Sequence, residues 1–342
     1  MSTRARAATR RGSRPAVVDT RAAPLLFALE GSRALGERVG ACLGRPLAPH
    51  EEREFEYGQH KTRALVSVRR RRVYVLHSLH GEPGQSANDK LVRLLFFTGA
   101  LRDAGAAEVT AVVPFLCYAR KERRTQLRDP VSTRYLAALF EAVGTERVVV
   151  LDVHSLAAFE NAFRCRVEHL EAQGAFAAHF ARALADEEVT VVSPDAGGAK
   201  RATRFRGALE DALGRRVGAA WIDKTRSGGE VRGEAVAIGE LRGRAAVLYD
   251  DMICGGTTVA RAARACLEAG ATRVQAAATH GAFTLAANAA LADAALERVV
   301  VLDTLPPFAL DPGLVARRLT LLPGAPLLAE GIRRVEGTSA EE

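Results

Sequence analysis

The sequence predicts an α/β protein of two tandem domains, each with a mostly parallel sheet flanked by helices. Short β-branched runs alternate with stretches of helical period in both halves of the 342-residue chain. Strands that are apolar throughout and separated by helices indicate a parallel sheet covered on both faces. The length itself is typical of about two domains. We therefore expect a tail at residues 1–23, an N-terminal domain at 24–170 and a C-terminal domain at 171–335.

The individual elements follow in order from these two patterns. In the first half, strands are predicted at 73–76, 109–113 and 147–151. Helical stretches at 88–104 and 131–142 separate them. The second half repeats the order of strands and helices of the first half, but its sequence is not a close repeat. Its predicted strands are 189–192, 218–222, 245–249, 273–278 and 299–302.

The composition excludes several classes of protein. An apolar fraction of 48% with 26% charged residues is ordinary for a globular chain. No apolar run approaches the roughly 18–20 residues that a membrane-spanning helix needs. The five cysteines are scattered without a C-x-x-C pair, which indicates reduced intracellular thiols and not a disulfide or zinc framework. We expect a cytoplasmic protein without membrane contact.

The net charge of +8 lies mainly in the N-terminal tail. Residues 1–23 hold six arginines and one acid, so they contribute five of the eight charges. Only five of the 48 basic residues are lysines, an arginine excess more typical of codon bias than of nucleic-acid recognition. The tail is predicted to be disordered, with targeting or weak polyanion binding as the alternatives. No specific nucleic-acid partner is expected.

Acids, glycines and hydroxyls follow the predicted strands. Ligands of open α/β sheets bind at the carboxyl ends of the strands, so these positions carry the functional signal. The segment after one predicted strand, 223–226, also carries a lysine and an arginine. The combination is typical of a magnesium-assisted phosphate site. These positions are Asp152 with His154, 193–198, 223–226, 250–258 and 279–281.

The strongest motif is the segment 247–258, VLYDDMICGGTT. A strand delivers Asp250 and Asp251, and a Gly/Thr-rich turn then opens a helix that begins near Val259. Backbone N–H groups of such a turn can hold a phosphate, whereas carboxylates repel it and accept hydrogen bonds from sugar hydroxyls. The motif predicts a ribose 5-phosphate cradle, and the alternative is a simple helix-capping turn. The predicted binding residues are Asp250, Asp251, Cys254, Gly255, Gly256, Thr257 and Thr258.

This segment resembles the phosphoribosyl-binding signature shared by phosphoribosyltransferases and ribose-phosphate pyrophosphokinases. Segment 192–202 is similar to the pyrophosphate loop of the pyrophosphokinases, and 221–226 to the start of their catalytic flexible loop. The resemblance covers about residues 25–335 over six further motifs, and it implies two phosphoribosyltransferase-like domains. A transferase has one such domain and would not carry this N-terminal half. The other similar segments are 113–120, 151–155, 279–281 and 327–330.

The resemblance also implies a metal site. Asp195 would bind Mg²⁺, while Gly197 and Gly198 would let the backbone approach pyrophosphate closely. His154 would be a second metal ligand. Because Mg²⁺ prefers oxygen ligands, His154 taken by itself is more typical of a structural histidine.

The N-terminal half departs from the family where the nucleotide is held. The family usually shows Phe-x-Asp-Gly-Glu, contributed by a neighbouring subunit, but residues 55–59 here read FEYGQ. Lys121 stands in place of a neutral amide, and Cys254 in place of a carboxylate. These departures leave the nucleotide preference open. The resemblance implies that ATP or pyrophosphate contacts Phe55, Tyr57, Gln59, Arg120, Lys121, Asp195, Gly197 and Gly198.

The leading hypothesis is a ribose-phosphate diphosphokinase that converts MgATP and ribose 5-phosphate into PRPP and AMP. The resemblance makes Lys224 and Arg226 the catalytic cations, which would neutralise charge on the transferring group. From spacing alone they are equally typical of solvated loop charges. The alternatives are a catalytically weak or silent relative that regulates an active partner and, third, a phosphoribosyltransferase. The resemblance further implies hexamers in which a neighbouring subunit completes the ATP site.

Overall fold

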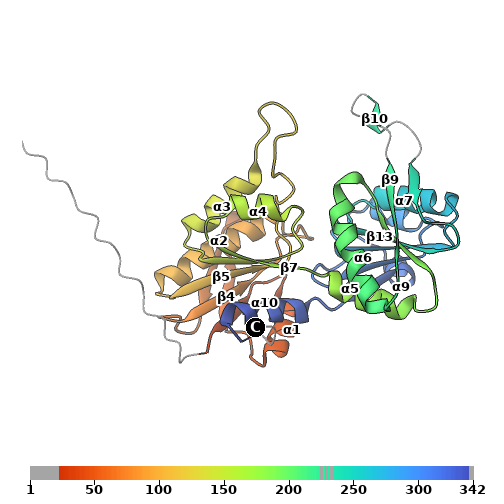
Figure 1. Cartoon of the computed structure of the whole chain (residues 1–342). Coiled ribbons are helices and arrows are strands. Elements are labelled where there is room, and N and C mark those ends of the chain that lie inside the picture. Colours follow the sequence, from red (N-terminus) through yellow and green to blue (C-terminus); the bar gives the residue numbers. More distant parts are fainter. Residues whose placement is uncertain (1–22, 224–225, 228–229, 232–234, 339–342) are drawn as a thin grey trace, which may run out of the picture.

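The computed structural model describes residues 23–223, 226–227, 230–231 and 235–338, and two sheets lie side by side in it (Figure 1). All five strands of the N-terminal sheet are parallel, in the order β1-β4-β5-β6-β7. Runs such as RVVVL in β6 are almost completely buried, as expected for a parallel sheet covered on both faces. The strands are β1 (Leu25–Ala28), β4 (Arg72–Leu76), β5 (Glu108–Val113), β6 (Arg147–Leu151) and β7 (Arg166–Leu170).

Helices cover both faces of this sheet, with α2, α3 and α4 on one side and α1 on the other (Figure 1). The long loop after β4 ends where Ser86 and Asp89 form a capping box. Asp89 N donates to Ser86 Oγ at 3.2 Å, and Ser86 N donates to Asp89 Oδ2 at 2.8 Å, which fixes the start of α2. The further elements are α1 (Arg33–Leu43), the antiparallel hairpin of β2 (His50–Glu54) and β3 (His60–Ala64) around η1 (Glu56–Gly58), α2 (Ala87–Asp103), α3 (Ser132–Ala142) and α4 (Leu156–Ala162).

The C-terminal sheet has seven strands in the order β12-β9-β8-β13-β14-β15-β16, and only β12 is antiparallel to its neighbour. Its strands are β8 (Val189–Ser193), β9 (Gly218–Asp223), β12 (Val236–Gly239), β13 (Ala245–Met252), β14 (Arg273–His280), β15 (Arg298–Leu302) and β16 (Leu319–Leu322). The short pair β10 (Arg226–Ser227) and β11 (Glu230–Val231) lies between β9 and β12 in the sequence. The helical elements are α5 (Gln173–Ala183), η2 (Ala196–Gly198), α6 (Ala199–Leu213), α7 (Thr257–Glu268), α8 (Ala287–Leu291), α9 (Pro312–Arg318) and α10 (Ala325–Glu336).

One hydrophobic core connects the two halves of the chain. Phe205 of α6 stacks on Tyr249 of β13, with ring centroids 4.1 Å apart. The same core continues through α10, which lies beside α1 on the N-terminal sheet (Figure 1). A Cβ on Gly331 of α10 would lie 2.7 Å from Leu170 Cδ1, so only glycine allows this close approach. The last helix of the chain thus packs on the first domain, while the predicted division at residue 170 stays a prediction.

The fold class is the one that the sequence predicts. The strands expected at 73–76, 109–113 and 147–151, and those expected in the second half, all form. The pattern did not indicate β1, the β2–β3 hairpin, β7, β12 or β16, because these are short or carry polar residues. Among the described residues, no helix is long and apolar enough to cross a membrane.

Candidate active site

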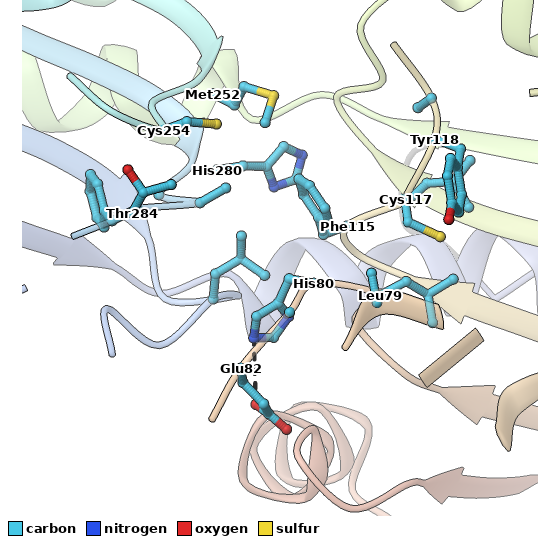
Figure 2. A pocket seen from close by; sticks show the side chains of 18 of the residues that line it. Leu79, His80, Glu82, Phe115, Cys117, Tyr118, Met252, Cys254, His280 and Thr284 are labelled. Carbon is cyan, nitrogen blue, oxygen red and sulfur yellow. Dashed lines mark ion pairs between the residues drawn. The ribbon is translucent and has the colours of Figure 1, made fainter. Parts of the chain in front are cut away.

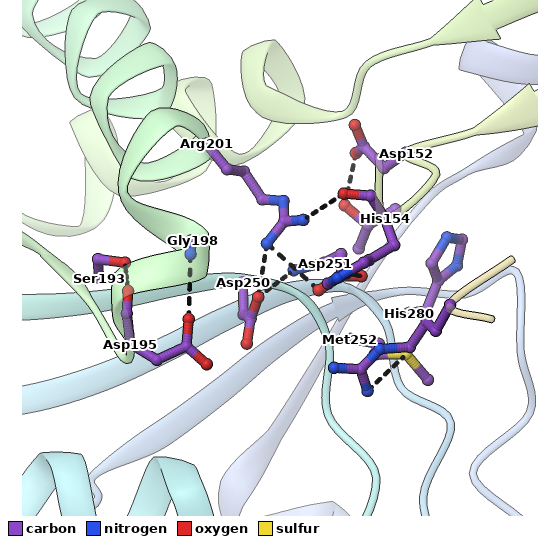
Figure 3. Close-up of polar contacts among 12 residues, drawn as sticks. Asp152, His154, Ser193, Asp195, Gly198, Arg201, Asp250, Asp251, Met252 and His280 are labelled. Atoms are coloured by element: carbon purple, nitrogen blue, oxygen red, sulfur yellow. Dashed lines mark hydrogen bonds and ion pairs between the residues drawn. The ribbon is translucent and has the colours of Figure 1, made fainter. Parts of the chain in front are cut away.

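The carboxyl ends of strands from both sheets meet between the domains, and Figure 3 shows the polar contacts there. Thr279 Oγ1, at the end of β14, donates to Asp152 Oδ2, which follows β6, at 2.6 Å. His280 Nε2 donates to the carbonyl oxygen of Leu151 at 2.9 Å. These bonds hold the two sheet edges together. Residues that the sequence places after separate strands therefore share one cleft.

Asp250 and Asp251, at the end of β13, are both paired with Arg201 of α6 (Figure 3). Arg201 Nη1 lies 2.6 Å from Asp250 Oδ1 and 3.2 Å from Asp251 Oδ1. Its other terminal nitrogen, Nη2, donates to the carbonyl oxygen of His154 at 3.2 Å. Sequence reasoning gave Arg201 no role. The only signal for it was its position three residues after Gly198 of the predicted pyrophosphate loop.

Burial and charge drive the pKa values of the two acids apart. Burial, then the hydrogen bond and charge of Asp251, raise the pKa of Asp250 to about 7. Burial also acts to raise the pKa of Asp251, but the His154 hydrogen bond and the Arg201 charge outweigh it and hold that pKa well below its usual value. The pair therefore carries one firmly ionised carboxylate and one that protonates easily.

His154 lies against the acid pair. Its Nδ1 donates to Asp251 Oδ2 at 2.9 Å, and this hydrogen bond raises the pKa of His154 although burial opposes it. Asp195, the other predicted metal ligand, lies on the opposite side of the acid pair in Figure 3. Nowhere in the described part of the chain do three or more His, Cys, Asp or Glu residues form a cluster suited to a metal ion. The metal assignment of both residues stays a prediction.

The predicted pyrophosphate loop follows β8. Asp195 Oδ1 accepts a hydrogen bond from Gly198 N at 3.0 Å, and Ser193 Oγ donates to the carbonyl oxygen of Asp195 at 2.6 Å. A Cβ on Gly198 would lie 2.9 Å from Ser193 Oγ, and one on Gly197 would lie 3.3 Å from Asp195 Oδ1. A side chain at Gly198 would therefore force Ser193 to move, and one at Gly197 would be tight against the Asp195 carboxylate.

The predicted phosphate turn leads from β13 into α7, which begins at Thr257, two residues before the expected start. Gly256 has a φ of 73°, and a Cβ there would lie 3.0 Å from the side chains of Ala290 and Leu291. Only glycine fits this left-handed turn. The turn opens the 12-residue helix α7 shortly after β13 ends, and the N–H groups at the start of a helix favour an anion. Cys254, Gly255 and Thr258 belong to the same segment.

A pocket of about 1170 Å³ extends from this cleft between the domains (Figure 2). Arg120, Lys121 and His154 line it from the N-terminal domain, and Asp251 and Cys254 from the C-terminal domain. Arg120 Nη1 also lies 3.7 Å from Met252 Sδ. The structure thus brings Arg120, Lys121, His154 and Asp251 to one cavity, whereas Asp250 does not line it.

Other predicted residues lie elsewhere or outside the described part of the chain. Phe55, Tyr57 and Gln59 lie at the tip of the β2–β3 hairpin and do not line the pocket. Tyr57 is 99% exposed, and the contact of these three residues with the nucleotide of a neighbouring copy stays a prediction. Lys224 lies outside the described residues, and Arg226 lies in β10 but its side chain is not described.

We expect Asp251→Asn to lower the pKa of His154, because an amide cannot hold the imidazolium as a carboxylate does. In the folded wild type this pKa is raised above 6.5, so the contribution to stability is full below that pH and lost as the pH rises through the folded-state value. NMR titration of the imidazole in metal-free protein measures the shift. An unchanged pKa in the variant would contradict the contact.

Comparison with known proteins places this geometry in a family. The model of the N-terminal domain of ribose phosphate pyrophosphokinase matches residues 25–144. The model of the phosphoribosyl synthetase-associated domain matches residues 231–340. Together the two matches span most of both sheets.

Individual relatives agree over nearly the whole chain. Ribose-phosphate pyrophosphokinase 1 of Streptococcus agalactiae is 34% identical over 283 residues, which are 82% of this chain and 84% of that protein. Ribose-phosphate pyrophosphokinase of Caldanaerobacter subterraneus is 33% identical over 318 residues, 93% of this chain and 96% of that protein. The crystal structure of phosphoribosylpyrophosphate synthetase from Mycobacterium smegmatis superposes with a TM-score of 0.82 at 33% identity and covers 92% of this chain and 99% of that chain. The chain belongs to the ribose-phosphate pyrophosphokinase family of transferase enzymes.

Proposed function

We propose that this protein transfers the β,γ-diphosphoryl group of ATP to the 1-hydroxyl of ribose 5-phosphate, giving PRPP and AMP. The observation that carries the proposal is the meeting of Asp251 and Cys254, from the acid pair and the predicted phosphate turn of one domain, with His154 and Arg120 from the other. The hydroxyl oxygen attacks the β-phosphorus and gives up its proton to solvent, the bond from that phosphorus to the α,β-bridging oxygen breaks, and AMP leaves with that oxygen. Positioning the two substrates in line supplies much of the rate.

Ribose 5-phosphate would lie along the segment from Asp250 to Thr258. The N–H groups at the start of α7 would hold the 5-phosphate, and the acid pair would accept hydrogen bonds from the ring hydroxyls. Arg201 keeps Asp250 and Asp251 in place, because it pairs with both. The 1-hydroxyl of the sugar would then point toward the part of the pocket that Arg120 and Lys121 line.

The donor set fits Mg²⁺ bound together with nucleotide. Mg²⁺ typically takes one or two protein carboxylates and completes its shell with phosphates and water, so the lack of a metal cluster among the described residues is compatible with it. Asp195 and His154 would hold the ion, which would neutralise charge on the diphosphoryl group. Of these two ligands, the imidazole of His154 is the less usual one for Mg²⁺.

The nucleotide would be held from two chains. Arg120 and Lys121 line the pocket and would contact its phosphates, while Phe55, Tyr57 and Gln59 would be supplied by a neighbouring copy in a hexamer. Lys224 and Arg226 would act on the transferring group from the segment after β9. We place this reaction in the cytoplasm.

An assay that detects AMP from ATP, with and without ribose 5-phosphate, tests the function. AMP that forms only when both substrates and Mg²⁺ are present is the expected result. A chain that binds both substrates and forms no AMP would be the regulatory relative. The substitutions at Tyr57, Gln59 and Cys254 are what favour that second candidate. AMP formation that does not depend on ribose 5-phosphate would contradict both.

We expect weak discrimination between ATP and GTP. The amide of Gln59 can both donate and accept hydrogen bonds, whereas a glutamate there would only accept. Steady-state kinetics with both nucleotides measure the preference, and Gln59→Glu is the matched control that should raise it toward ATP. A preference for ATP above about a thousandfold in the wild type, roughly 4 kcal/mol, would contradict the expectation.

A further inference from the structure

One end of the pocket is formed by residues outside the acid pair and the phosphate turn. We call it the loop end and define it by His80, Glu82 and Gln85, from the loop between β4 and α2, and by Phe308, which precedes α9. In Figure 2, His80 and Glu82 lie across the cavity from Met252 and Cys254. The loop end also follows a carboxyl end of the N-terminal sheet, where α/β folds bind ligands.

Polar atoms at the loop end lack hydrogen-bond partners within the described residues. His80 is only 7% exposed, yet neither Nδ1 nor Nε2 makes a hydrogen bond of normal geometry, although the ring lies close to the backbone of Ser78. The nearest carboxylate oxygen, Glu82 Oε2, lies 3.6 Å from Nε2, too far for a hydrogen bond. Gln85 Oε1 is likewise buried and unpaired. A ligand that pairs with these atoms would remove the free-energy cost of burying polar groups without partners.

The loop end is electrically neutral. Glu82 Oε2 pairs with the fully buried Lys90 Nζ at 3.0 Å, so the two charges balance. Burial, followed by the charge of Lys90, lowers the pKa of His80 to about 4. At pH 7 the ring therefore offers one N–H donor and one nitrogen acceptor. These groups suit an uncharged ligand with both donors and acceptors along its edge.

The walls of the loop end suit a flat ring. The planes of His80 and Phe308 are within 15° of parallel, and their centroids are 6.5 Å apart. Leu79 and Phe115 line the adjacent wall. Apolar faces with a few convergent polar groups are typical of small-molecule sites, and parallel rings favour stacking. A nucleobase combines a flat apolar face with a polar edge of mixed donors and acceptors.

We propose that the loop end, formed by His80, Glu82, Gln85 and Phe308, binds a nucleobase within a single chain. The choice of this ligand class rests on the proposed nucleotide substrate. The site itself is separate from the contact expected of Phe55, Tyr57 and Gln59, which would come from another copy. The ring stacks on Phe308, and its edge pairs with His80 and Gln85.

Adenosine is the probe, because it carries the base and no phosphate for the other subsites. Isothermal titration with the full-length protein, without Mg²⁺ or ribose 5-phosphate, measures its affinity. We expect Phe308→Ala to weaken binding about tenfold through lost stacking, and Gln85→Ala to weaken it about threefold or more through one lost hydrogen bond. Phe308 is 54% exposed, so its removal should leave the melting temperature nearly unchanged.

Matched controls are Phe96→Ala, an exposed phenylalanine of α2, and Gln126→Ala, in an exposed loop. Neither residue lines the pocket, and both variants should bind adenosine as the wild type does. Absence of adenosine binding to the wild type, or equal affinity in the wild type, Phe308→Ala and Gln85→Ala, overturns the proposal. A loss confined to Gln59→Ala overturns it as well.

Competition identifies the source of the base. If a non-hydrolysable ATP analogue displaces adenosine from the wild type, the loop end holds the base of the substrate. If both bind together, it holds the base of a separate nucleoside or nucleotide. Either result depends on binding alone, so a failed AMP assay would contradict the proposed reaction and leave this site standing.

Discussion

Lys224→Ala is expected to lower turnover about a thousandfold, or about 4 kcal/mol, by comparison with the loss of other groups that stabilise transition-state charge. The strand β9 ends at Asp223, beside β8 and on the same sheet edge as Asp195. A cation that follows it is therefore close in sequence to the edge where we propose that the diphosphoryl group is transferred. A charge that acts mainly on the transition state affects turnover and leaves the Michaelis constants of both substrates nearly unchanged.

Steady-state kinetics of the purified variant separate turnover from the Michaelis constants. Lys224→Arg is the matched control, because it keeps the positive charge and should lose much less turnover. Near-normal turnover in Lys224→Ala, or a defect confined to a raised Michaelis constant, would show that this cation binds substrate and does not catalyse. A regulatory subunit without turnover would show no such difference between the two variants.

The double variant Asp250→Asn with Asp251→Asn is expected to weaken ribose 5-phosphate binding and lower kcat/KM about a hundredfold or more. Each lost hydrogen bond to a charged group is worth about 1.5–3 kcal/mol. The double variant also removes both carboxylates that pair with Arg201, and leaves this arginine with amides in their place. Loss of both partners of a buried charge is destabilising, so the melting temperature should fall too.

The single variants separate binding from stability. Asp250, with a pKa near 7, is partly protonated at neutral pH, so Asp250→Asn should be the milder change. Asp251 is ionised and paired with both His154 and Arg201, so Asp251→Asn should be the more severe. Asp211→Asn, at an exposed position of α6, is the matched control. The cradle assignment is wrong if the double variant keeps its turnover and its Michaelis constant for ribose 5-phosphate.

Much of the fold could be predicted because its strands carry their own signal. Apolar β-branched runs such as those of β5 and β6 must be buried on both faces, and burial on both faces requires helices between them. The short polar hairpin at residues 50–64 escaped prediction, since its register depends on packing against α2 and not on its own pattern. The packing of α10 on the N-terminal sheet could not be predicted either, because an amphipathic pattern shows that one face of a helix is buried but not against which element.

The sequence by itself determined the local structure of the predicted phosphate turn and of the acid pair. Gly256 with its left-handed φ, Asp250 and Asp251 are local features that follow from a strand, a turn and a helix in order. Only the tertiary structure decided that Arg201 pairs with both acids and that His154 from the other domain meets Asp251. It also decided that the loop after β4 leaves His80 buried and unpaired at one end of the pocket. These contacts join residues up to 97 positions apart, and no local pattern encodes them, because each depends on how two separately folded sheet edges face one another.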